Sequence, residues 1–308
     1  MDAPAARVPL TSSQRTVLSI ATVLGTMMYA IDSTIVNVAL PHMQGSLQAS
    51  QDQIAWVLTS YIVTSAIATA PAGWLAARFG LRRVLAIAVL GFTAGSMLCG
   101  FATSLGEMVA FRVLQGLCGA SLVPLSQVAL IQEYPREQHG RVIALWTMGV
   151  LVGPILGPTL GGYLTDELSW RWAFFINLPI GALAYFGVLE GLGAEHDDRS
   201  RPFDWTGFLL LSVALGALQL MLDRGQTLGW FDSAEIVAEG CVAALAFYMF
   251  VVHTLTAEHP FVDRSLFRDR KMHQRYREFF GALQAGAGEA RPGPLEIDAE
   301  WVREAAPD

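Results

Sequence analysis

Charged residues are scarce in this sequence. Only 15% of its 308 residues are Asp, Glu, Lys or Arg, whereas 53% are hydrophobic. A soluble globular domain is about 25% charged, so the composition excludes an ordinary soluble protein and indicates an integral membrane protein. The net charge of −7 says little about partners, because the charged side chains gather between the apolar segments and in the last part of the chain.

Catalytic signatures are missing as well. The three cysteines, Cys99, Cys118 and Cys241, are scattered through apolar runs, which predicts inert packing residues rather than a disulfide framework or a metal site. The sequence contains no Gly-x-Ser-x-Gly, His-Glu-x-x-His or Walker motif. We therefore expect no catalytic residues, no bound metal and no enzymatic activity.

Eight apolar segments approach the length of about 20 residues that a helix needs to cross a bilayer. They cover residues 17–40, 54–76, 84–103, 108–131, 142–164, 174–192, 205–222 and 236–255. The sequence thus predicts an all-α integral membrane protein, with a six-helix bundle over 17–192 and two additional transmembrane helices over 204–256. A charged linker over 193–203 joins them. The flanking segments are 1–16 and a poorly ordered, polar tail over 257–308.

Basic residues alternate between the two sides of these predicted spans. One set of loops and ends holds Arg7, Arg15, Arg78, Arg82, Arg83, Arg136, Arg141, Arg199, Arg201, Arg264, Arg268, Arg270 and Lys271. The loops on the other side hold only Arg171 and Arg224. Since Lys and Arg are enriched in cytoplasmic loops, we expect both termini to be cytoplasmic in a multi-pass protein of the cell (inner or plasma) membrane.

A glycine stripe runs through the fifth predicted span. Glycines recur at every fourth position, and prolines and a further glycine lie among them: Gly149, Gly153, Pro154, Gly157, Pro158, Gly161 and Gly162. In water such a segment favours a loop, or even a phosphate cradle, but no Lys-Ser/Thr pair follows the glycines. In lipid, the same spacing leaves one helix face bare and lets another helix approach closely.

Two ionisable residues stand out within the spans: Asp32 in the first and Arg112 early in the fourth. A charged side chain at mid-membrane costs about 2.5–3.5 kcal/mol, so Asp32 needs a partner, a wet cavity or a proton. The alternatives are that Asp32 is solvated near the outer end and that Arg112 reaches the outer interface with its stem buried. In the functional interpretation, Asp32 binds and releases a proton and Arg112 tunes it, with Gln115 on the same helix face.

Other candidates are less specific. Tyr61 and Trp146 fit an interfacial aromatic belt, or else a cavity for an apolar or cationic ligand. Asn37 and Gln115 are polar residues that could face the same cavity, while Asn37, Gln127 and Asn177 could also form hydrogen bonds between helices.

The turn after the second span carries glycines and arginines that are candidates for a cytoplasmic gate: Gly73, Arg78, Gly80, Arg82 and Arg83. Gly80 suits a tight turn. The enrichment of basic residues in cytoplasmic loops would by itself explain the arginines.

Several of these stretches resemble the motifs of one family, in the same order. They are residues 32–41, 73–83, 112–120 and 149–162, with further similarity at 170–181 and 225–232. Together they resemble the major facilitator superfamily, specifically its fourteen-helix drug/proton antiporter branch (EmrB/QacA type), over about residues 14–271.

The resemblance implies a transporter in a lipid bilayer that exports small amphipathic or cationic compounds. The proton gradient would drive it, with no cofactor and no nucleic-acid partner. It implies that Asp32 takes up and releases the proton, that Arg112 tunes this step, and that the glycine stripe lies between the two six-helix halves of the transporter.

The sequence departs from the family pattern in two places. The loop motif usually has an aspartate that takes part in a charge lock on the cytoplasmic gate, and Ala77 stands there instead. After about residue 270 the family continues into six more helices, whereas this sequence continues with polar residues. The expectation is a shortened product, or else a half-size protein that assembles with an unknown partner. The alternative function is a non-transporting remnant or a membrane interaction subunit.

Overall fold

The computed structural model describes residues 10–193, 202–257 and 260. Within these residues all regular secondary structure is helical. Most of the predicted tail over 257–308 and most of the linker over 193–203 lie outside the described residues, as do residues 1–9. The basic residues that fall outside them are Arg7, Arg199, Arg201, Arg264, Arg268, Arg270 and Lys271.

The helices follow one another with short connections. In chain order they are α1 (Ser12–Ser46), α2 (Gln51–Thr69), α3 (Ala72–Phe79), α4 (Leu81–Phe101), α5 (Leu105–Gly119), α6 (Leu122–Glu133), η1 (Arg136–Gln138), α7 (His139–Glu167), α8 (Trp172–Phe175), α9 (Asn177–Gly191), α10 (Trp205–Leu228), η2 (Trp230–Asp232) and α11 (Ala234–Thr256).

Seven helical stretches of the described chain are long and apolar enough to cross a membrane, and α2 with α3 makes an eighth if this bent pair is one span. Each of the eight predicted segments falls on one of these stretches, so the prediction of an all-α membrane protein is confirmed. α2 and α3 meet at an angle of 54°. The bend falls at Pro71, where the missing N–H and fixed φ of proline disfavour continuous helix. Gly80 then turns the chain into α4 with φ of 87°, a conformation open chiefly to glycine.

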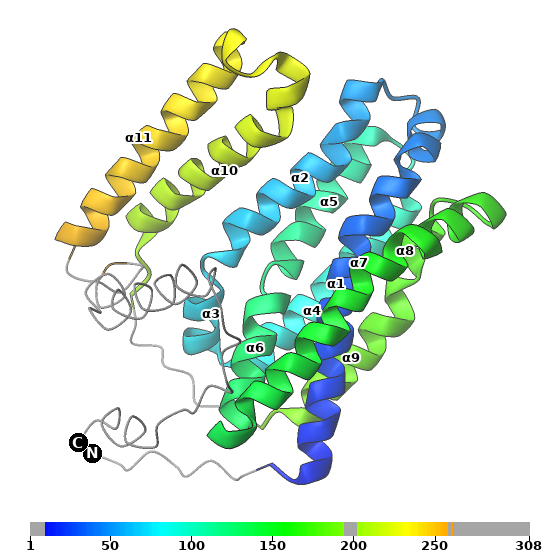
Figure 1. Cartoon of the computed structure of the whole chain (residues 1–308), viewed down its shortest axis with the longest axis vertical. Coiled ribbons are helices and arrows are strands. Elements are labelled where there is room, and N and C mark those ends of the chain that lie inside the picture. Colours follow the sequence, from blue (N-terminus) through cyan, green and yellow to red (C-terminus); the bar gives the residue numbers. More distant parts are fainter. Residues whose placement is uncertain (1–9, 194–201, 258–259, 261–308) are drawn as a thin grey trace, which may run out of the picture. The chain divides into compact units, whose positions relative to one another are not determined.

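The glycine stripe of α7 packs directly against α1, its neighbour in Figure 1. A Cβ atom added at Gly153 would lie 2.8 Å from the Ala30 side chain, and one at Gly161 would lie 2.9 Å from that of Ile35. The predicted close approach of a second helix is therefore present. In this chain α1 of the same bundle supplies that helix, and the expectation that the stripe lies between two halves of a transporter stays a prediction.

α10 and α11 form a helix pair that is attached to the outside of the bundle along α2 (Figure 1). Near one end of α10 the hydroxyl of Thr59 donates a hydrogen bond to Asp223. In the middle, Gly216 faces Ile67, whose side chain would lie 3.4 Å from an added Cβ. α10 and α2 are therefore joined by polar and apolar contacts along their lengths.

Apolar side chains form two buried clusters in the bundle. One contains Met28 and Phe92, and the other contains Ile31, Ile35 and Phe174. Because Met28 and Ile31 of α1 belong to different clusters, Asp32 lies close to the boundary between them. The bundle thus surrounds this polar residue with apolar packing on both sides along α1.

Candidate functional site

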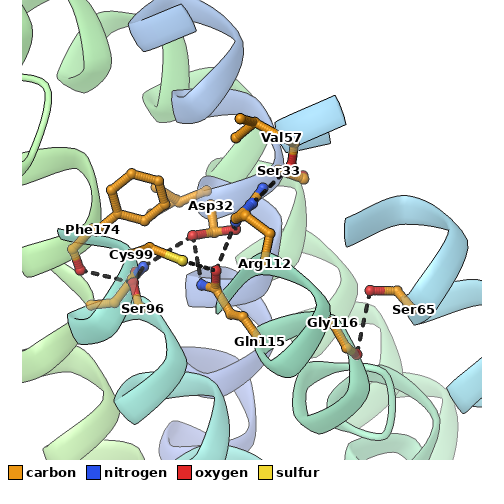
Figure 2. Close-up of polar contacts among 12 residues, drawn as sticks. Asp32, Ser33, Val57, Ser65, Ser96, Cys99, Arg112, Gln115, Gly116 and Phe174 are labelled. Atoms are coloured by element: carbon orange, nitrogen blue, oxygen red, sulfur yellow. Dashed lines mark hydrogen bonds and ion pairs between the residues drawn. The ribbon is translucent and has the colours of Figure 1, made fainter. Parts of the chain in front are cut away.

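Asp32 and Arg112 form an ion pair in the interior of the bundle (Figure 2). The Asp32 Oδ2 atom lies 2.6 Å from Arg112 Nη1, and both side chains are 0% exposed. The alternatives in which Asp32 is solvated and Arg112 reaches the interface are therefore wrong. The pair joins α1 to α5.

Two amide side chains complete the surroundings of the carboxylate. Gln115 Nε2 donates to Asp32 Oδ1 at 2.9 Å, and Gln115 Oε1 accepts from Arg112 Nη1 at 2.8 Å. Asn177 Nδ2, at the start of α9, donates to Asp32 Oδ1 at 3.3 Å. Bonds from charge-assisted and amide donors stabilise a buried carboxylate that has lost its water.

The network extends from Asn177 into α4 and α8. Asn177 Nδ2 also donates to Ser96 Oγ at 2.8 Å, and the Ser96 hydroxyl donates to the Phe174 carbonyl at 2.9 Å. On the other side, the Cys99 thiol donates to Gln115 Oε1, with 3.6 Å between sulfur and oxygen. Four helices and the short α8 are therefore connected through side chains that surround one carboxylate (Figure 2).

Arg112 is held by α2 as well as by Asp32. Its Nε donates to the Val57 carbonyl at 3.2 Å, and its guanidinium carbon lies 4.1 Å from the centre of the Tyr61 ring. Arg112 Nη2, Tyr61 Oη and Asn177 Oδ1 are buried and lack a hydrogen-bond partner among the described residues. The site thus has three polar atoms near the ion pair that can form further hydrogen bonds.

Small residues bring the helices of this site close together. A Cβ added at Gly95 of α4 would lie 3.0 Å from Gln115, and one at Gly116 of α5 would lie 2.8 Å from the Tyr61 carbonyl. Ser65 donates to the Gly116 carbonyl at 3.4 Å (Figure 2). These close approaches allow the short side chain of Asp32 to reach donors from two other helices, α5 and α9.

The predicted gate residues lie around the α3–α4 turn. Arg78 lies over the Trp74 ring, with 5.3 Å between the guanidinium carbon and the ring centre. Arg82 Nη2 donates to the Leu189 carbonyl at 2.6 Å, Arg83 is exposed, and a Cβ at Gly73 would meet nothing within 4 Å. Arg78, which follows Ala77 in the sequence, thus contacts the Trp74 ring.

The four predicted cavity residues separate into two groups. Tyr61 and Gln115 both lie in the Asp32 site. Asn37 is exposed and donates to the Ser33 carbonyl at 2.9 Å. Trp146 is buried on α7, one turn before Gly149, which contacts Val23. Only Tyr61 and Gln115 of the four are therefore brought together with the ion pair.

The sequence profile of the Major Facilitator Superfamily matches residues 22–265. The chain belongs to the Major Facilitator Superfamily. The multidrug export protein EmrB of Escherichia coli (strain K12) is 41% identical over 283 residues, which are 89% of this chain and 55% of EmrB. The fatty acid resistance protein FarB of Neisseria gonorrhoeae is 42% identical over 248 residues, 80% of this chain and 49% of FarB. The chain thus spans about half the length of the curated relatives that it matches.

Solved structures of transporters share the fold at low sequence identity. A peptide transporter POT in complex with sulfate superposes with a TM-score of 0.60 and 16% identity, over 82% of this chain and 55% of that one. A D-xylose-proton symporter gives a TM-score of 0.51 and 14% identity, over 78% and 67%. The family match and the apolar helices together show a multi-pass membrane protein that lies in a lipid bilayer.

Sequence reasoning missed part of this superfamily member's polar site. Ser96 was not singled out, and Cys99 was expected to be an inert packing residue, yet both belong to the network. Their three-residue spacing on α4 places them on one helix face, which is the signal that could have found them.

Proposed function

We propose that this chain forms the first helices of a proton-coupled exporter of small amphipathic or cationic compounds. The observation that carries the proposal is the ion pair of Asp32 and Arg112, fully buried in a chain of a transporter family. Ionisable residues inside a membrane protein mark ion and proton pathways. Relatives named for multidrug export and fatty acid resistance support the choice of substrate class.

In this proposal Asp32 is the group that gains and loses the proton. As a carboxylate it accepts bonds from Arg112, Gln115 and Asn177, and protonation weakens its attraction to Arg112. The gain or loss of one charge then changes how strongly α1 is held to α5 and α9. Binding of the proton and of substrate would be linked by a coupling free energy, typically about 1–3 kcal/mol.

The finer topology also belongs to the proposal. The helices up to α9 form the N-terminal six-span bundle, α10 and α11 are an added pair, and both termini are cytoplasmic in the cell (inner or plasma) membrane. The bias of basic residues supports this orientation. The proton gradient supplies the energy, and alternating access moves two bundles about a central site.

Transport in proteoliposomes tests the function. Two proteins are each reconstituted with a cationic dye and an imposed pH gradient. One is this chain alone, and the other is this chain joined to the remaining helices of E. coli EmrB. We expect gradient-driven dye movement in the joined version and its loss in Asp32→Asn. Dye movement that is equal with and without the gradient, or unchanged in Asp32→Asn, would overturn the proposal. Activity in the joined version alone would assign the transport cycle to both halves together.

A further inference from the structure

The contacts of Asp32 fit only one of its two charge states. Its carboxylate receives bonds from Arg112 Nη1, Gln115 Nε2 and Asn177 Nδ2, at 2.6, 2.9 and 3.3 Å. All three groups are donors. A protonated carboxyl group must itself donate a hydrogen bond and needs an acceptor. The arrangement in Figure 2 therefore belongs to the ionised aspartate, and protonation requires one neighbour to turn an acceptor toward it.

Asn177 has the acceptor that is free to do this. Arg112 has no acceptor atom. Gln115 Oε1 already accepts from Arg112 Nη1 and the Cys99 thiol. Asn177 Oδ1 is buried and has no partner among the described residues. Leaving such an atom unpaired costs free energy, so this oxygen is available as the acceptor in a second state, in which Asp32 is protonated.

We propose that Asn177 is a switch. Its amide changes orientation with the charge on Asp32, and this rotation changes the hydrogen bonds at the corner between α8 and α9. This inference rests on the proposed role of Asp32 as the proton carrier. A hydronium ion on the side to which the site opens gives its proton to Asp32 Oδ1, so that one O–H bond of hydronium breaks, an O–H bond forms on Asp32 and a water molecule is left. The Asn177 amide then turns about its Cβ–Cγ bond, so that Asn177 Oδ1 accepts a hydrogen bond from the protonated Asp32. The rotation of the amide itself breaks no covalent bond.

The turn reverses a chain of hydrogen bonds. In the ionised state Asn177 Nδ2 donates to Ser96 Oγ, and the Ser96 hydroxyl donates to the Phe174 carbonyl. After the turn, the Ser96 hydroxyl finds the Asn177 oxygen in place of the amide nitrogen and donates to it. The Phe174 carbonyl then loses its donor from α4. Since Phe174 lies near the end of α8 and Asn177 begins α9, on either side of the break at Ile176, the switch loosens this corner.

Other ionisable groups around Asp32 do not change charge in the acidic range. They are Arg112 from α5, Cys99 from α4 and Tyr61 from α2, with Tyr29 of α1 beside Tyr61 at 5.9 Å between ring centres. Arginine stays protonated, and thiol and phenol groups stay neutral, when the pH falls from neutrality. An acid-driven change at this site is therefore assigned to Asp32.

Two measurements on the full chain in lipid nanodiscs test the switch. Infrared difference titration follows the carbonyl band of a protonated carboxyl group, with Asp32→Asn as the blank. Hydrogen exchange, corrected for its intrinsic pH dependence, follows the peptide that contains residues 172–177. We expect exchange at this corner to rise over the pH range in which the Asp32 band appears.

The Asn177→Leu variant should keep the Asp32 band and lose the pH dependence of exchange at the corner. Asn37→Leu is the matched control, because Asn37 is an exposed asparagine outside the site, and it should keep both signals. Ser96→Ala cuts the link to Phe174 and keeps the Asn177–Asp32 contact, so it serves if Asn177→Leu does not fold, and it too should lose the coupling.

The outcomes separate the two proposals. The switch is overturned if hydrogen exchange at the corner still changes together with the Asp32 band in Asn177→Leu, or in Ser96→Ala if only that variant folds. The proposed function is left standing by this result. The absence of any Asp32-dependent carboxyl band between neutral and acidic pH overturns the proposed function, and the switch with it.

Discussion

Gly157 of α7 lies against Thr34 of α1 so closely that a methyl group at position 157 would overlap the Thr34 side chain. Gly157→Ala therefore forces α1 and α7 apart or distorts one of them. Overpacking of this kind costs about 1–3 kcal/mol. We expect a lower midpoint of thermal unfolding for Gly157→Ala in lipid nanodiscs.

Gly162 provides the control on the same helix. A Cβ added there would meet nothing within 4 Å, so Gly162→Ala should leave the midpoint unchanged or raise it slightly, since alanine is the better helix former. Equal losses in the two variants would show that helix propensity, and not the contact with α1, accounts for the effect.

The buried ion pair predicts strong non-additivity. Asp32→Asn or Arg112→Gln alone leaves the other charge buried without its partner, which costs about 3–5 kcal/mol. The double variant removes both charges, so its stability should exceed the value expected from the sum of the two single losses. A double-mutant cycle measured by unfolding in nanodiscs gives this interaction free energy.

The control cycle uses the pair of Arg224 and Glu235, whose side chains are 31% and 52% exposed. An exposed pair contributes about 0–1 kcal/mol. Additive losses at Asp32 and Arg112, similar to those at the exposed pair, would contradict a buried ion pair.

The spans were predictable because a backbone in lipid must satisfy its hydrogen bonds within each helix, which leaves a long apolar segment in the sequence. The partner of each polar residue was not predictable in the same way. The sequence shows that Asp32 needs a partner, but Arg112 lies 80 residues away, and only the arrangement of helices brings the two together. Gln115 was easier, since its i+3 spacing from Arg112 is local.

The glycine stripe illustrates the same limit. Its spacing correctly predicted a close approach by another helix, but it does not say which helix approaches. In the structure α1 supplies that helix. Ser96 was missed for a related reason, because its spacing from Cys99 indicates only a shared helix face and does not identify Asn177 and Phe174 as its partners.

The aromatic contact between Trp74 and Phe203 predicts how the α10–α11 pair is fixed to the bundle. Their ring centres are 4.5 Å apart, and Arg78 lies over the same indole. Phe203→Ala removes this contact at the start of α10, and an aromatic pair contributes about 0.5–1.5 kcal/mol beyond its buried area. We expect faster hydrogen exchange in the first turns of α10 in this variant.

Phe231→Ala is the matched change, since Phe231 is 74% exposed in η2 at the opposite end of the helix pair. It should leave exchange at the start of α10 unaltered. Unchanged exchange in Phe203→Ala would mean that the contacts of α10 with α2, such as Asp223 with Thr59 and Gly216 with Ile67, fix the pair without Phe203.

Asp204 joins the start of α10 to the end of α11. Substitutions of Asp204 should therefore lower the stability of the helix pair by graded amounts. Its Oδ1 accepts the Gly207 N–H at 2.8 Å, which caps α10, and lies 2.9 Å from His253 Nε2 of α11. Asp204→Asn keeps an oxygen for the cap and loses the charge, whereas Asp204→Ala loses both, and loss of a side-chain cap costs about 1 kcal/mol. The unfolding midpoint should therefore fall further for Ala than for Asn.

Ser233→Ala is the control, because Ser233 precedes α11 without a side-chain cap bond and its loss should change little. A midpoint that falls equally in Asp204→Asn and Asp204→Ala would assign the stabilisation to the charge on Asp204 and its contact with His253, and not to the cap.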